Sequence, residues 1–419
     1  MSKKKIKVSK IEIIAEIANA HQGKPDLAIE IAKSAIRSGA DAVKFQVYFA
    51  DELLTYKHPR FMHFKKQSFK EKDWKKIFNS IKPLKKKIYC DIFGEKALEL
   101  AEKYDLDGYK IHSSDISNVK LLYKVSKLNK RKKIFLSAGG STLRELAKEI
   151  SILRNKNKLI LLYGFQNYPT KINDLNLNNI KYLKKYFGNY CDIGYMDHTD
   201  ADDKMNFFLP ILSVKLGAKI IEKHITYNRQ KKGIDYHSSL NPNEFNEFTR
   251  IIKSKNILDK KLFEKLKICL GKKSYFLTEK ELEYRSEVKK VWVAKKDLKP
   301  NHVIKINDVI MKRSEEKDES LFIDRIVGTK IIKRINKDEI IKTSYLKNKV
   351  LALIIARTKS SRLHKKILKK FQGFTSLEHI ILRLKRSKKI DEIILCTTKD
   401  KSDDLICKIA KNYKINCIR

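Results

Sequence analysis

The chain has 419 residues, of which 93 are Lys or Arg and 49 are Asp or Glu, so its formal net charge is +44. A hydrophobic fraction of 42% is enough for real cores and argues against wholesale disorder, and the length suits two or three domains. The basic residues are scattered along the chain instead of forming one block. This favours a solvated lysine surface over a dedicated nucleic-acid groove, so nucleic acid is not an expected partner.

The cysteines and the N-terminal stretch indicate a cytoplasmic protein. The six cysteines form no C-x-x-C pair, which argues against a zinc ribbon or a disulfide framework and favours reduced thiols. The apolar stretch from Ile11 to Ala20 is short and carries Glu12 and Glu16, so it does not suit a secretory signal. No run approaches the ~18 apolar residues of a membrane span, so we expect no membrane association.

Short apolar runs alternate with stretches of helical period from Ile11 to about Lys223. Eight candidate strands begin near Ile11, Ala42, Lys86, Asp107, Lys133, Lys158, Tyr190 and Ala218. Between them lie amphipathic stretches that include residues 25–38, 95–104, 142–154 and 203–216. This order predicts an α/β fold of the (β/α)8, or TIM-barrel, type. A doubly wound open sheet is the alternative.

Two further segments follow the predicted barrel, which we assign to residues 1–275. Residues 281–347 contain short strand-like pieces separated by turn signals and predict a small β-rich domain. Residues 349–419 begin again with an apolar strand, a basic loop, a helix and a second strand. They predict the opening of another α/β domain, an incomplete unit of nucleotidyltransferase-like, Rossmann-like type.

Polar residues gather where each candidate strand meets its following loop, and in a barrel those ends converge on one site. Lysines are the least suited to burial there, because an unpaired buried ammonium is costly. The lysines at strand ends are Lys44, Lys110 and Lys223. They predict a pocket for phosphate or carboxylate, to which serines would add hydroxyl donors: Ser113, Ser114 and Ser137. Alternatively, each lysine pairs with a strand-end carboxylate, such as Glu16, Asp115 or Glu222, and both interpretations can hold together.

Two histidines follow consecutive strands of the predicted barrel. His198 comes after the seventh strand and His224 after the eighth. Two imidazoles with open positions could hold a divalent ion beside substrate oxygens, with Asp197 and Glu222 as neighbouring partners. The alternative is that each is a buried histidine whose hydrogen bonds are satisfied by the protein.

Several motifs in order resemble those of the sialic acid synthase family, which condenses phosphoenolpyruvate with an N-acetylmannosamine-type sugar. The first is AEIANAHQG with SGADAVKFQ, within Glu12 to Gln46. The later motifs are YKIHSSDISN at 109–118, LSAGGST at 136–142, NYPT at 167–170, GYMDHT at 194–199, EKHIT at 222–226 and GIDYHSSLNP at 233–242. The resemblance covers nearly all of the first 270 residues.

The resemblance implies roles for residues at matching positions. It implies that His198 and His224 bind a divalent metal ion, Mn²⁺ or Mg²⁺. It implies phosphoenolpyruvate contacts from Lys44, Lys110, Ser113 and Ser137. Asp115 falls where a catalytic glutamate usually stands, with Glu16 in support, and Lys110 lies beside the reacting groups. Asp235 matches a sugar-binding aspartate.

The predicted β-rich domain resembles the antifreeze-like (SAF) domain that follows the barrel in these synthases. The family motif KRPG is represented by Lys312, Arg313 and Ser314. In the family that arginine reaches the sugar in the neighbouring subunit. The resemblance therefore implies that Arg313 contacts the sugar and that the protein is a domain-swapped homodimer.

Four positions depart from the family pattern. Asp91 stands where a threonine is usual, and its carboxylate would repel phosphate unless it faces away. Met196 replaces a serine and Tyr163 a histidine, while Asp115 is one methylene shorter than glutamate. We interpret these departures as marks of a divergent branch that uses a related sugar.

The last residues resemble the start of nucleotide-sugar cytidylyltransferases and spore-coat polysaccharide biosynthesis proteins. The motif is IIARTKSSRLHKKIL, in which Arg357, Ser361, Arg362 and Lys366 match, while His364 and Lys365 replace Pro-Gly. Because the later acidic residues that hold magnesium are missing, we predict no nucleotidyl transfer by this segment.

Together these patterns predict a transferase of surface polysaccharide biosynthesis. It would join phosphoenolpyruvate to an N-acylated hexosamine, with a divalent metal ion, and yield a sialic-acid-like nonulosonic acid and phosphate. The alternatives are another barrel aldolase or lyase acting on a sugar, and a noncatalytic basic protein that binds nucleic acid or glycan.

Overall fold

The computed structural model describes residues 11–128, 131–154, 158–165, 169–254, 260–316, 322–347, 350–359, 363 and 365–419. The chain separates into two units. One runs to Gly328 and includes Lys333–Thr343, and the other comprises Thr329–Ile332 and Ser344–Arg419. Some of the residues singled out in the sequence lie outside the described part: Asn167, Tyr168, Ser361, Arg362 and His364.

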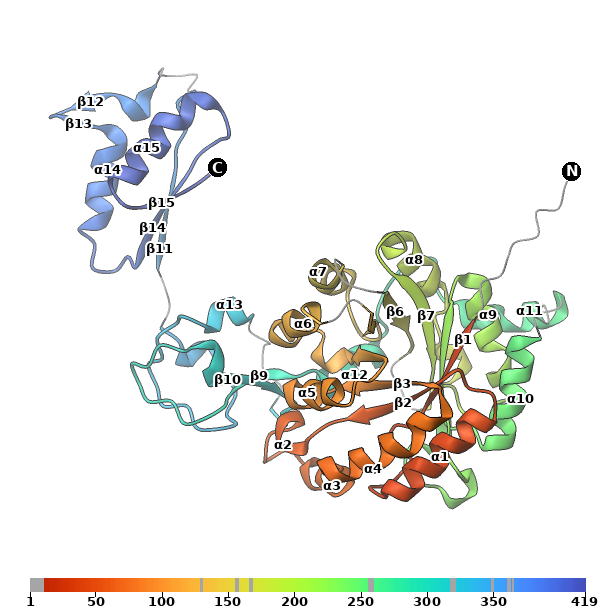
Figure 1. The fold of residues 1–419 in the computed structure, drawn as a ribbon. Helices are drawn as coiled ribbons and strands as arrows, with labels where there is room; N and C mark the ends of the chain where they lie inside the picture. The colour runs from red at the N-terminus through yellow and green to blue at the C-terminus, as the bar shows by residue number, and fades with distance from the viewer. Residues whose placement is uncertain are drawn as a thin grey trace, which may run out of the picture. The chain divides into compact units, whose positions relative to one another are not determined.

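Eight parallel strands close into a barrel in chain order, with the last strand paired to the first (Figure 1). They are β1 (Glu12–Glu16), β2 (Ala42–Val47), β3 (Lys87–Ile92), β4 (Gly108–Ile111), β5 (Lys133–Ser137), β6 (Leu159–Tyr163), β7 (Asp192–Asp197) and β8 (Ile220–His224). The predicted TIM barrel is confirmed. The open sheet is excluded, because an open sheet leaves its edge strands unpaired.

Helices surround the barrel (Figure 1). They are α1 (Pro25–Arg37), α2 (Ala50–Leu53), α3 (Phe61–Gln67), α4 (Glu71–Ile81), α5 (Glu95–Lys103), α6 (Val119–Ser126), α7 (Leu143–Leu153), α8 (Asn178–Phe187), α9 (Leu209–Leu216), α10 (Pro242–Lys253) and α11 (Lys260–Leu266). The helix predicted from residue 203 starts later, at α9, after the 3-10 turn η4 (Lys204–Phe207). Pro210 explains the late start, because proline suits only the first turn of a helix.

The barrel interior is apolar at the amino ends of the strands and polar at their carboxyl ends. The apolar layer consists of Ile14, Ala42, Tyr89, Phe135, Ile160, Leu162, Met196 and Ile220. Side chains alternate along a strand, so the interior position two residues after Ile14 is Glu16, and the one after Tyr89 is Asp91. The polar end is therefore the one that the strand-end residues predicted as the site.

The segment after the barrel contains less regular strand than the sequence predicted. It consists of α12 (Glu279–Val288), the antiparallel pair β9 (Val291–Ala294) and β10 (Val309–Lys312), and the short helix α13 (Ile323–Ile326). Residues from Glu281, which we assigned to the β-rich domain, lie in α12, because Thr278 and Glu281 form a capping box that starts a helix. Residues 302–306, HVIKI, are one of the strand-like pieces of 281–347, but they form a loop that leads into the turn η8 (Ile306–Asp308).

The second unit holds a three-stranded parallel sheet in the order β11–β14–β15. Its elements are β11 (Leu351–Ile355), the hairpin β12 (Lys370–Phe371) and β13 (Phe374–Thr375), α14 (Ser376–Lys385), β14 (Glu392–Cys396), α15 (Asp404–Asn412) and β15 (Asn416–Ile418). Leu377, Ile381, Leu395 and Ile406 form the centre of its core. The parallel βα order agrees with the α/β unit predicted here.

Among the described residues, no helix has both the length and the apolar character needed to span a bilayer.

Candidate active site

A small pocket lies at the carboxyl end of the barrel, where most of its strands contribute a side chain. Its wall consists of Glu16, Gln46, Asp91, Lys110, His112, Ser137, Met196, His198, Glu222 and His224. Five of the predicted site residues are among them: Glu16, Lys110, Ser137, His198 and His224. The convergence follows from the closed barrel, which brings these strand ends to one place.

The ammonium group of Lys44 lies in a buried cluster of carboxylates beneath this pocket. Its Nζ is 2.7 Å from Asp91 Oδ1 and 3.2 Å from Glu222 Oε1, and it also pairs with Glu16. Lys110 Nζ is 2.6 Å from Glu222 Oε1 and 3.7 Å from Asp91 Oδ2. The alternative in which strand-end lysines pair with carboxylates is therefore correct, and Lys110 also faces the predicted anion pocket.

Lys223 does not share in this pocket. Its Nζ is 2.8 Å from Asp197 Oδ2 and also donates a hydrogen bond to Asn206, and all three side chains are buried. Side chains alternate along β8, so Glu222 and His224 face the pocket while Lys223 points away from it. The prediction that three lysines converge in one anion site is wrong for Lys223.

Charges in the cluster are set by burial and by the two lysines. Burial raises the pKa of Glu16 to about 8, so this carboxyl group holds a proton at neutral pH. Burial alone would also raise the pKa of Glu222, but the ammonium groups of Lys110 and Lys44 outweigh it and lower that pKa to about 2. Glu16 is therefore the group in the pocket that is best suited to donate and accept a proton near neutral pH.

Asp91 faces the pocket and does not turn away from it. Its carboxylate lies between Lys44 and Lys110, so it occupies a position that an anionic substrate group would compete for. An incoming phosphate or carboxylate must therefore share these lysines with Asp91 or displace it.

Two buried serine hydroxyls retain unused hydrogen-bonding capacity. Within the described structure, Ser137 Oγ at the end of β5 and Ser113 Oγ in the turn after β4 have no hydrogen-bond partner. A buried hydroxyl without a partner is costly, and a ligand oxygen would satisfy it. This is consistent with the predicted contacts to a bound anion.

His198 and His224 have the geometry of neighbouring ligands. Their ring centroids are 5.5 Å apart, and His198 Nδ1 lies 2.9 Å from the Phe165 carbonyl oxygen. A carbonyl only accepts, so Nδ1 carries the proton and Nε2 keeps its lone pair, the usual arrangement for a metal-binding histidine. Burial lowers the pKa of His198 to about 4 and that of His224 well below its ordinary value, so both rings are neutral.

The pair fits one side of a divalent-metal site. Neutral imidazoles are the form that binds a metal ion, and both rings face the pocket. The described residues contain no group of three or more His, Cys, Asp or Glu placed to hold a metal. A bound ion would therefore take its remaining ligands from substrate oxygens or water.

Asp115 lies in the turn η2 (Ser113–Asp115) after β4, outside the pocket wall. Its carboxylate is 2.8 Å from Lys290 Nζ, and both side chains are fully buried. Lys290 Nζ also donates to the Phe93 carbonyl at 2.9 Å, and the Lys290 backbone N–H donates to Ser114 at 3.1 Å. The residue just before β9 thus holds the turn that carries Ser113 and Asp115.

Asp235 and Arg313 lie over neighbouring parts of the barrel end. Asp235 Oδ2 accepts a hydrogen bond from the backbone N–H of Asn19, just after β1, at 3.3 Å. Arg313 follows β10, and its guanidinium lies 5.8 Å from the ring centre of Phe93 at the end of β3. Its backbone bonds to Leu53 and Thr55 fix this position. Arg313 therefore lies over the barrel of its own chain.

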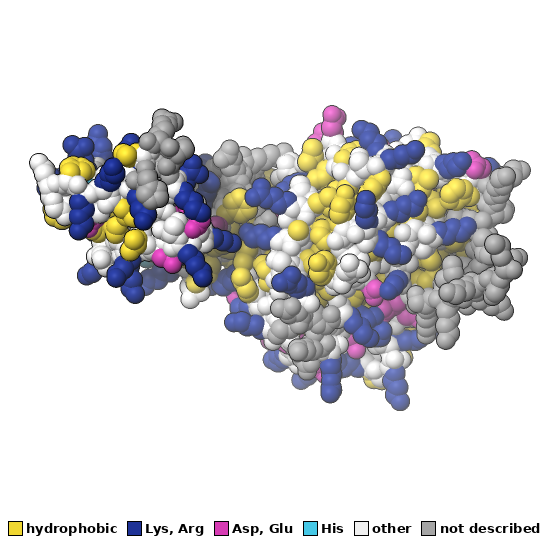
Figure 2. All heavy atoms as spheres, turned by 90° about the horizontal axis from the view of Figure 1, so that it is seen from above, with side chains coloured by type: hydrophobic (Ala, Val, Ile, Leu, Met, Phe, Trp, Pro, Cys, Tyr) yellow, Lys and Arg dark blue, Asp and Glu magenta, His cyan; other side chains and the backbone are white. Residues whose placement is uncertain are grey.

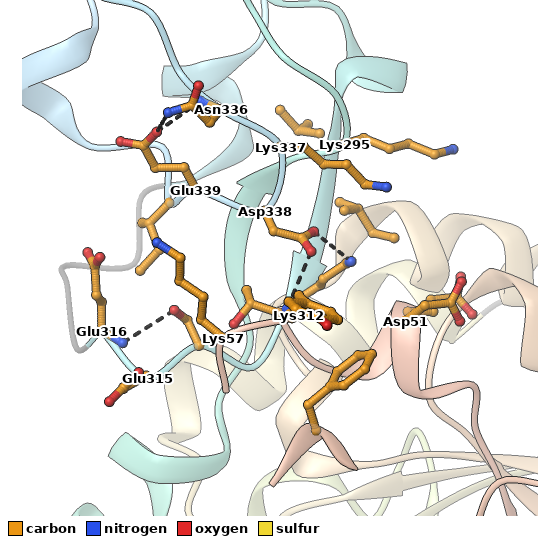
Figure 3. A pocket seen from close by; sticks show the side chains of 18 of the residues that line it. Asp51, Lys57, Lys295, Lys312, Glu315, Glu316, Asn336, Lys337, Asp338 and Glu339 are labelled. Carbon is orange, nitrogen blue, oxygen red and sulfur yellow. Dashed lines mark hydrogen bonds and ion pairs between the residues drawn. The ribbon is translucent and has the colours of Figure 1, made fainter. Parts of the chain in front are cut away.

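A larger cavity of about 990 Å³ lies beside α2 and β10 (Figure 3). Its wall mixes lysines with carboxylates, and several of these are already paired, such as Lys312 with Asp338 at 2.7 Å. It contains none of the predicted catalytic or metal-binding residues. We therefore place the active site in the smaller pocket, where the chemistry converges.

Sequence reasoning assigned no role to His112 or Lys290. His112 follows β4 directly, a position that could have marked it as a member of the site. Lys290 gives no such signal, because its partner Asp115 is 175 residues away in the chain.

The fold and the site define a TIM-barrel protein whose strand ends bring paired lysines and carboxylates beside two histidines. The chain belongs to the NeuB family, which matches residues 31–261. Residues 289–347 match the SAF domain, and residues 351–419 match the cytidylyltransferase family. All three resemblances seen in the sequence are thereby confirmed.

Two relatives match about four fifths of the chain. An uncharacterised protein of Methanocaldococcus jannaschii is 30% identical over 331 residues, which cover 78% of this chain and 92% of that protein. The N,N'-diacetyllegionaminic acid synthase of Campylobacter jejuni is 28% identical, covering 80% of this chain and 100% of that enzyme.

Two solved structures resemble this one. The N-acetylneuraminic acid synthetase of Leptospira borgpetersenii is 27% identical, with a TM-score of 0.54. The match covers 68% of this chain and 95% of the synthetase chain. The spore coat polysaccharide biosynthesis protein SpsE of Bacillus subtilis has a TM-score of 0.69 at 23% identity. The match covers 81% of this chain and 96% of the SpsE chain, and it supports the fold.

Replacing Lys290 with alanine should destabilise the first unit by about 3–5 kcal/mol, because it leaves the buried carboxylate of Asp115 without its positively charged partner. Thermal unfolding of the full chain measures the shift. The control is Lys103→Ala, whose pair with Glu71 is exposed and whose loss should change the midpoint little. Equal shifts in the two variants would contradict the role given to Lys290.

Removing the charge of Asp91 should strengthen anion binding, because Asp91 competes for Lys44 and Lys110. We expect Asp91→Asn and Asp91→Thr to lower the KM for phosphoenolpyruvate by about tenfold, an order-of-magnitude estimate for one close, partly screened charge. Steady-state kinetics measures this, with the exposed Asp51→Asn as control. A higher KM in both variants would show that Asp91 supports the anion site instead of opposing it.

Proposed function

We propose that this chain condenses phosphoenolpyruvate with an N-acylated hexosamine to give a nonulosonic acid and phosphate. The observation that carries the proposal is the pocket itself, in which Lys110 and Ser137 lie opposite His198 and His224 in a NeuB-family barrel. The names of the relatives support the same reaction class, since they include synthases of legionaminic, pseudaminic and neuraminic acids.

The proposed reaction forms one carbon–carbon bond, and at C2 it forms a carbon–oxygen bond to water and breaks the carbon–oxygen bond to phosphate. C3 of phosphoenolpyruvate attacks the aldehyde carbon of the open-chain sugar, and water adds to the cationic C2. The C2–O bond to phosphate then breaks and leaves a 2-keto acid. Lys110 would offset negative charge on the substrate, and Ser113 and Ser137 would donate to its anionic oxygens.

Glu16 is the residue best placed to move protons in this reaction. It lies in the pocket wall and holds a proton at neutral pH, since burial raises its pKa to about 8. It can therefore protonate the aldehyde oxygen as the new bond forms. The predicted role of Asp115 in handling the proton of water stays a prediction, because its carboxylate is held by Lys290.

We propose that His198 and His224 hold a divalent ion, Mn²⁺ or Mg²⁺. Such an ion would polarise the sugar aldehyde. The bond from His198 Nδ1 to the Phe165 carbonyl places the ring proton on Nδ1 and the lone pair on Nε2, the tautomer that a metal ligand needs, which supports this assignment.

We assign the sugar contacts to Asp235 and Arg313, as the resemblance implies. The acceptor would be N-acetylmannosamine or a dideoxy, diacetamido sugar of the kind that leads to legionaminic-type acids. Domain exchange between two copies stays a prediction, because Arg313 already lies over the barrel of its own chain. We propose that residues 1–275, 281–347 and 349–419 form three domains and that the protein is cytoplasmic.

A nucleic-acid-binding function is less well supported. On the face shown in Figure 2, Lys and Arg are scattered among apolar and uncharged side chains and form no single stripe. A groove that follows a phosphate backbone needs basic residues gathered along it. The other alternative, a sugar aldolase or lyase, would not release phosphate from phosphoenolpyruvate.

The test is phosphate release from phosphoenolpyruvate by the purified full chain, with Mn²⁺ and a panel of N-acylated hexosamines. We expect release that depends on the acceptor and is lost on chelation. His198→Ala should lower both activity and bound metal, while Lys103→Ala should change neither. Release that ignores the acceptor, or no release with any acceptor, would reject the proposed reaction.

A second test concerns Arg313, which lies in residues 281–347, here called the β module. It asks whether this arginine serves the barrel of its own chain or that of a second copy. Arg313→Ala should raise the KM for the sugar while leaving the KM for phosphoenolpyruvate within about twofold. In a domain-swapped dimer, mixing this variant with inactive His198→Ala should restore some sites with the wild-type sugar KM. No restoration after subunit exchange indicates that each chain uses its own Arg313.

A further inference from the structure

His112 is a pocket residue to which neither the motifs nor the proposed reaction assigns a role. It follows β4 directly, between Lys110 and the turn η2, and its side chain is buried. Its ring forms part of the pocket wall and lies against Phe93, with ring centres 5.0 Å apart. The imidazole is therefore held in one orientation at the place where substrate would bind.

The hydrogen bonds of His112 determine its tautomer. The backbone N–H of Ser114 donates to His112 Nδ1 at 3.1 Å. An N–H group can only donate, so Nδ1 is an acceptor, and the neutral ring must carry its proton on Nε2. Burial, together with the positive charges of Arg313 and Lys110, lowers the pKa of His112 well below its ordinary value, so the ring is neutral. His112 thus offers one N–H donor, at Nε2.

Neutral donors matter in this pocket because its lysines are already occupied. Lys44 and Lys110 each pair with carboxylates within the cluster. The hydroxyl of Ser137, in contrast, is buried without a partner in the described structure. An anionic ligand can satisfy a neutral N–H or O–H donor without first breaking an ion pair.

We propose that His112 donates a hydrogen bond from Nε2 to an anionic oxygen of phosphoenolpyruvate, beside Ser137. The inference rests on the proposed function and adds a residue that sets the affinity for this substrate. His112 lies two residues after Lys110 in the chain and in the same pocket wall as Ser137, which supports the contact. A hydrogen bond to a charged group is also stronger than a neutral one.

Two substitutions separate this role from a purely structural one. Asparagine at 112 can keep an acceptor near the position of Nδ1 for the Ser114 N–H but has no donor near that of Nε2. Glutamine can place an amide N–H near Nε2 but gives up the acceptor at Nδ1. His112→Asn therefore removes only the donor at Nε2, and His112→Gln removes only the acceptor at Nδ1. The thermal unfolding midpoint of each variant measures the loss of stability.

The experiment measures KM and kcat of the full chain for phosphoenolpyruvate at a saturating sugar concentration. We expect His112→Asn to raise this KM by about 10- to 100-fold, as for loss of one hydrogen bond to a charged group. The KM for the sugar should change little. His112→Gln should recover most of the affinity even where its thermal midpoint is lower.

The opposite result overturns the inference. Wild-type KM in His112→Asn with a raised KM in His112→Gln would show that the ring serves only to hold the turn η2. Inhibition constants for inorganic phosphate and pyruvate show whether His112 contacts the phosphate or the carboxylate of phosphoenolpyruvate. Phosphate should bind more weakly to His112→Asn if the contact is to the phosphate group, and pyruvate should do so if it is to the carboxylate. Unchanged constants for both analogues would also reject the contact. Absence of turnover by the wild-type chain would reject the proposed function, and this inference with it.

Discussion

The burial of the Lys44 ammonium group is the constraint on which the active site depends. An ammonium removed from water costs several kcal/mol unless opposite charges surround it closely. Here Asp91 on β3 and Glu222 on β8 supply those charges, and Glu16 on β1 adds a close carboxyl oxygen. Only a closed barrel brings these strands around one point, because β8 reaches β1 through the closure. The fold and the cluster therefore support each other.

The same cluster determines how the pocket can treat an anion. Glu16 is protonated near neutral pH, so two lysines face two ionised carboxylates, and the cluster carries little net charge. A bound anion then gains less from the lysines than their number suggests. Neutral donors such as Ser137 and His112 become correspondingly important. The +44 charge of the whole chain says little about this local balance.

Sequence reasoning located the strands and most of the pocket because both depend on local patterns. Runs such as AVKFQV and LILLY are buried on both faces, and polar residues such as Glu16 and His224 mark where they end. Interactions between distant segments were beyond that reasoning. The direction of Asp91 depends on its neighbours in the barrel, and Lys290 is explained only by Asp115. Lys223 was misassigned because one residue of register decides which face a strand residue occupies.

The link between the β module and the barrel extends the site beyond the strand ends. Lys290 binds the turn after β4, and Arg285 in α12 bonds Glu145 in α7 at 2.6 Å. Arg313 is fixed against Leu53 and Thr55 by backbone bonds. The turn η2 is thus held on one side by the module and on the other by His112, which directly follows β4. The position of the module therefore bears directly on the orientation of Ser113 and His112.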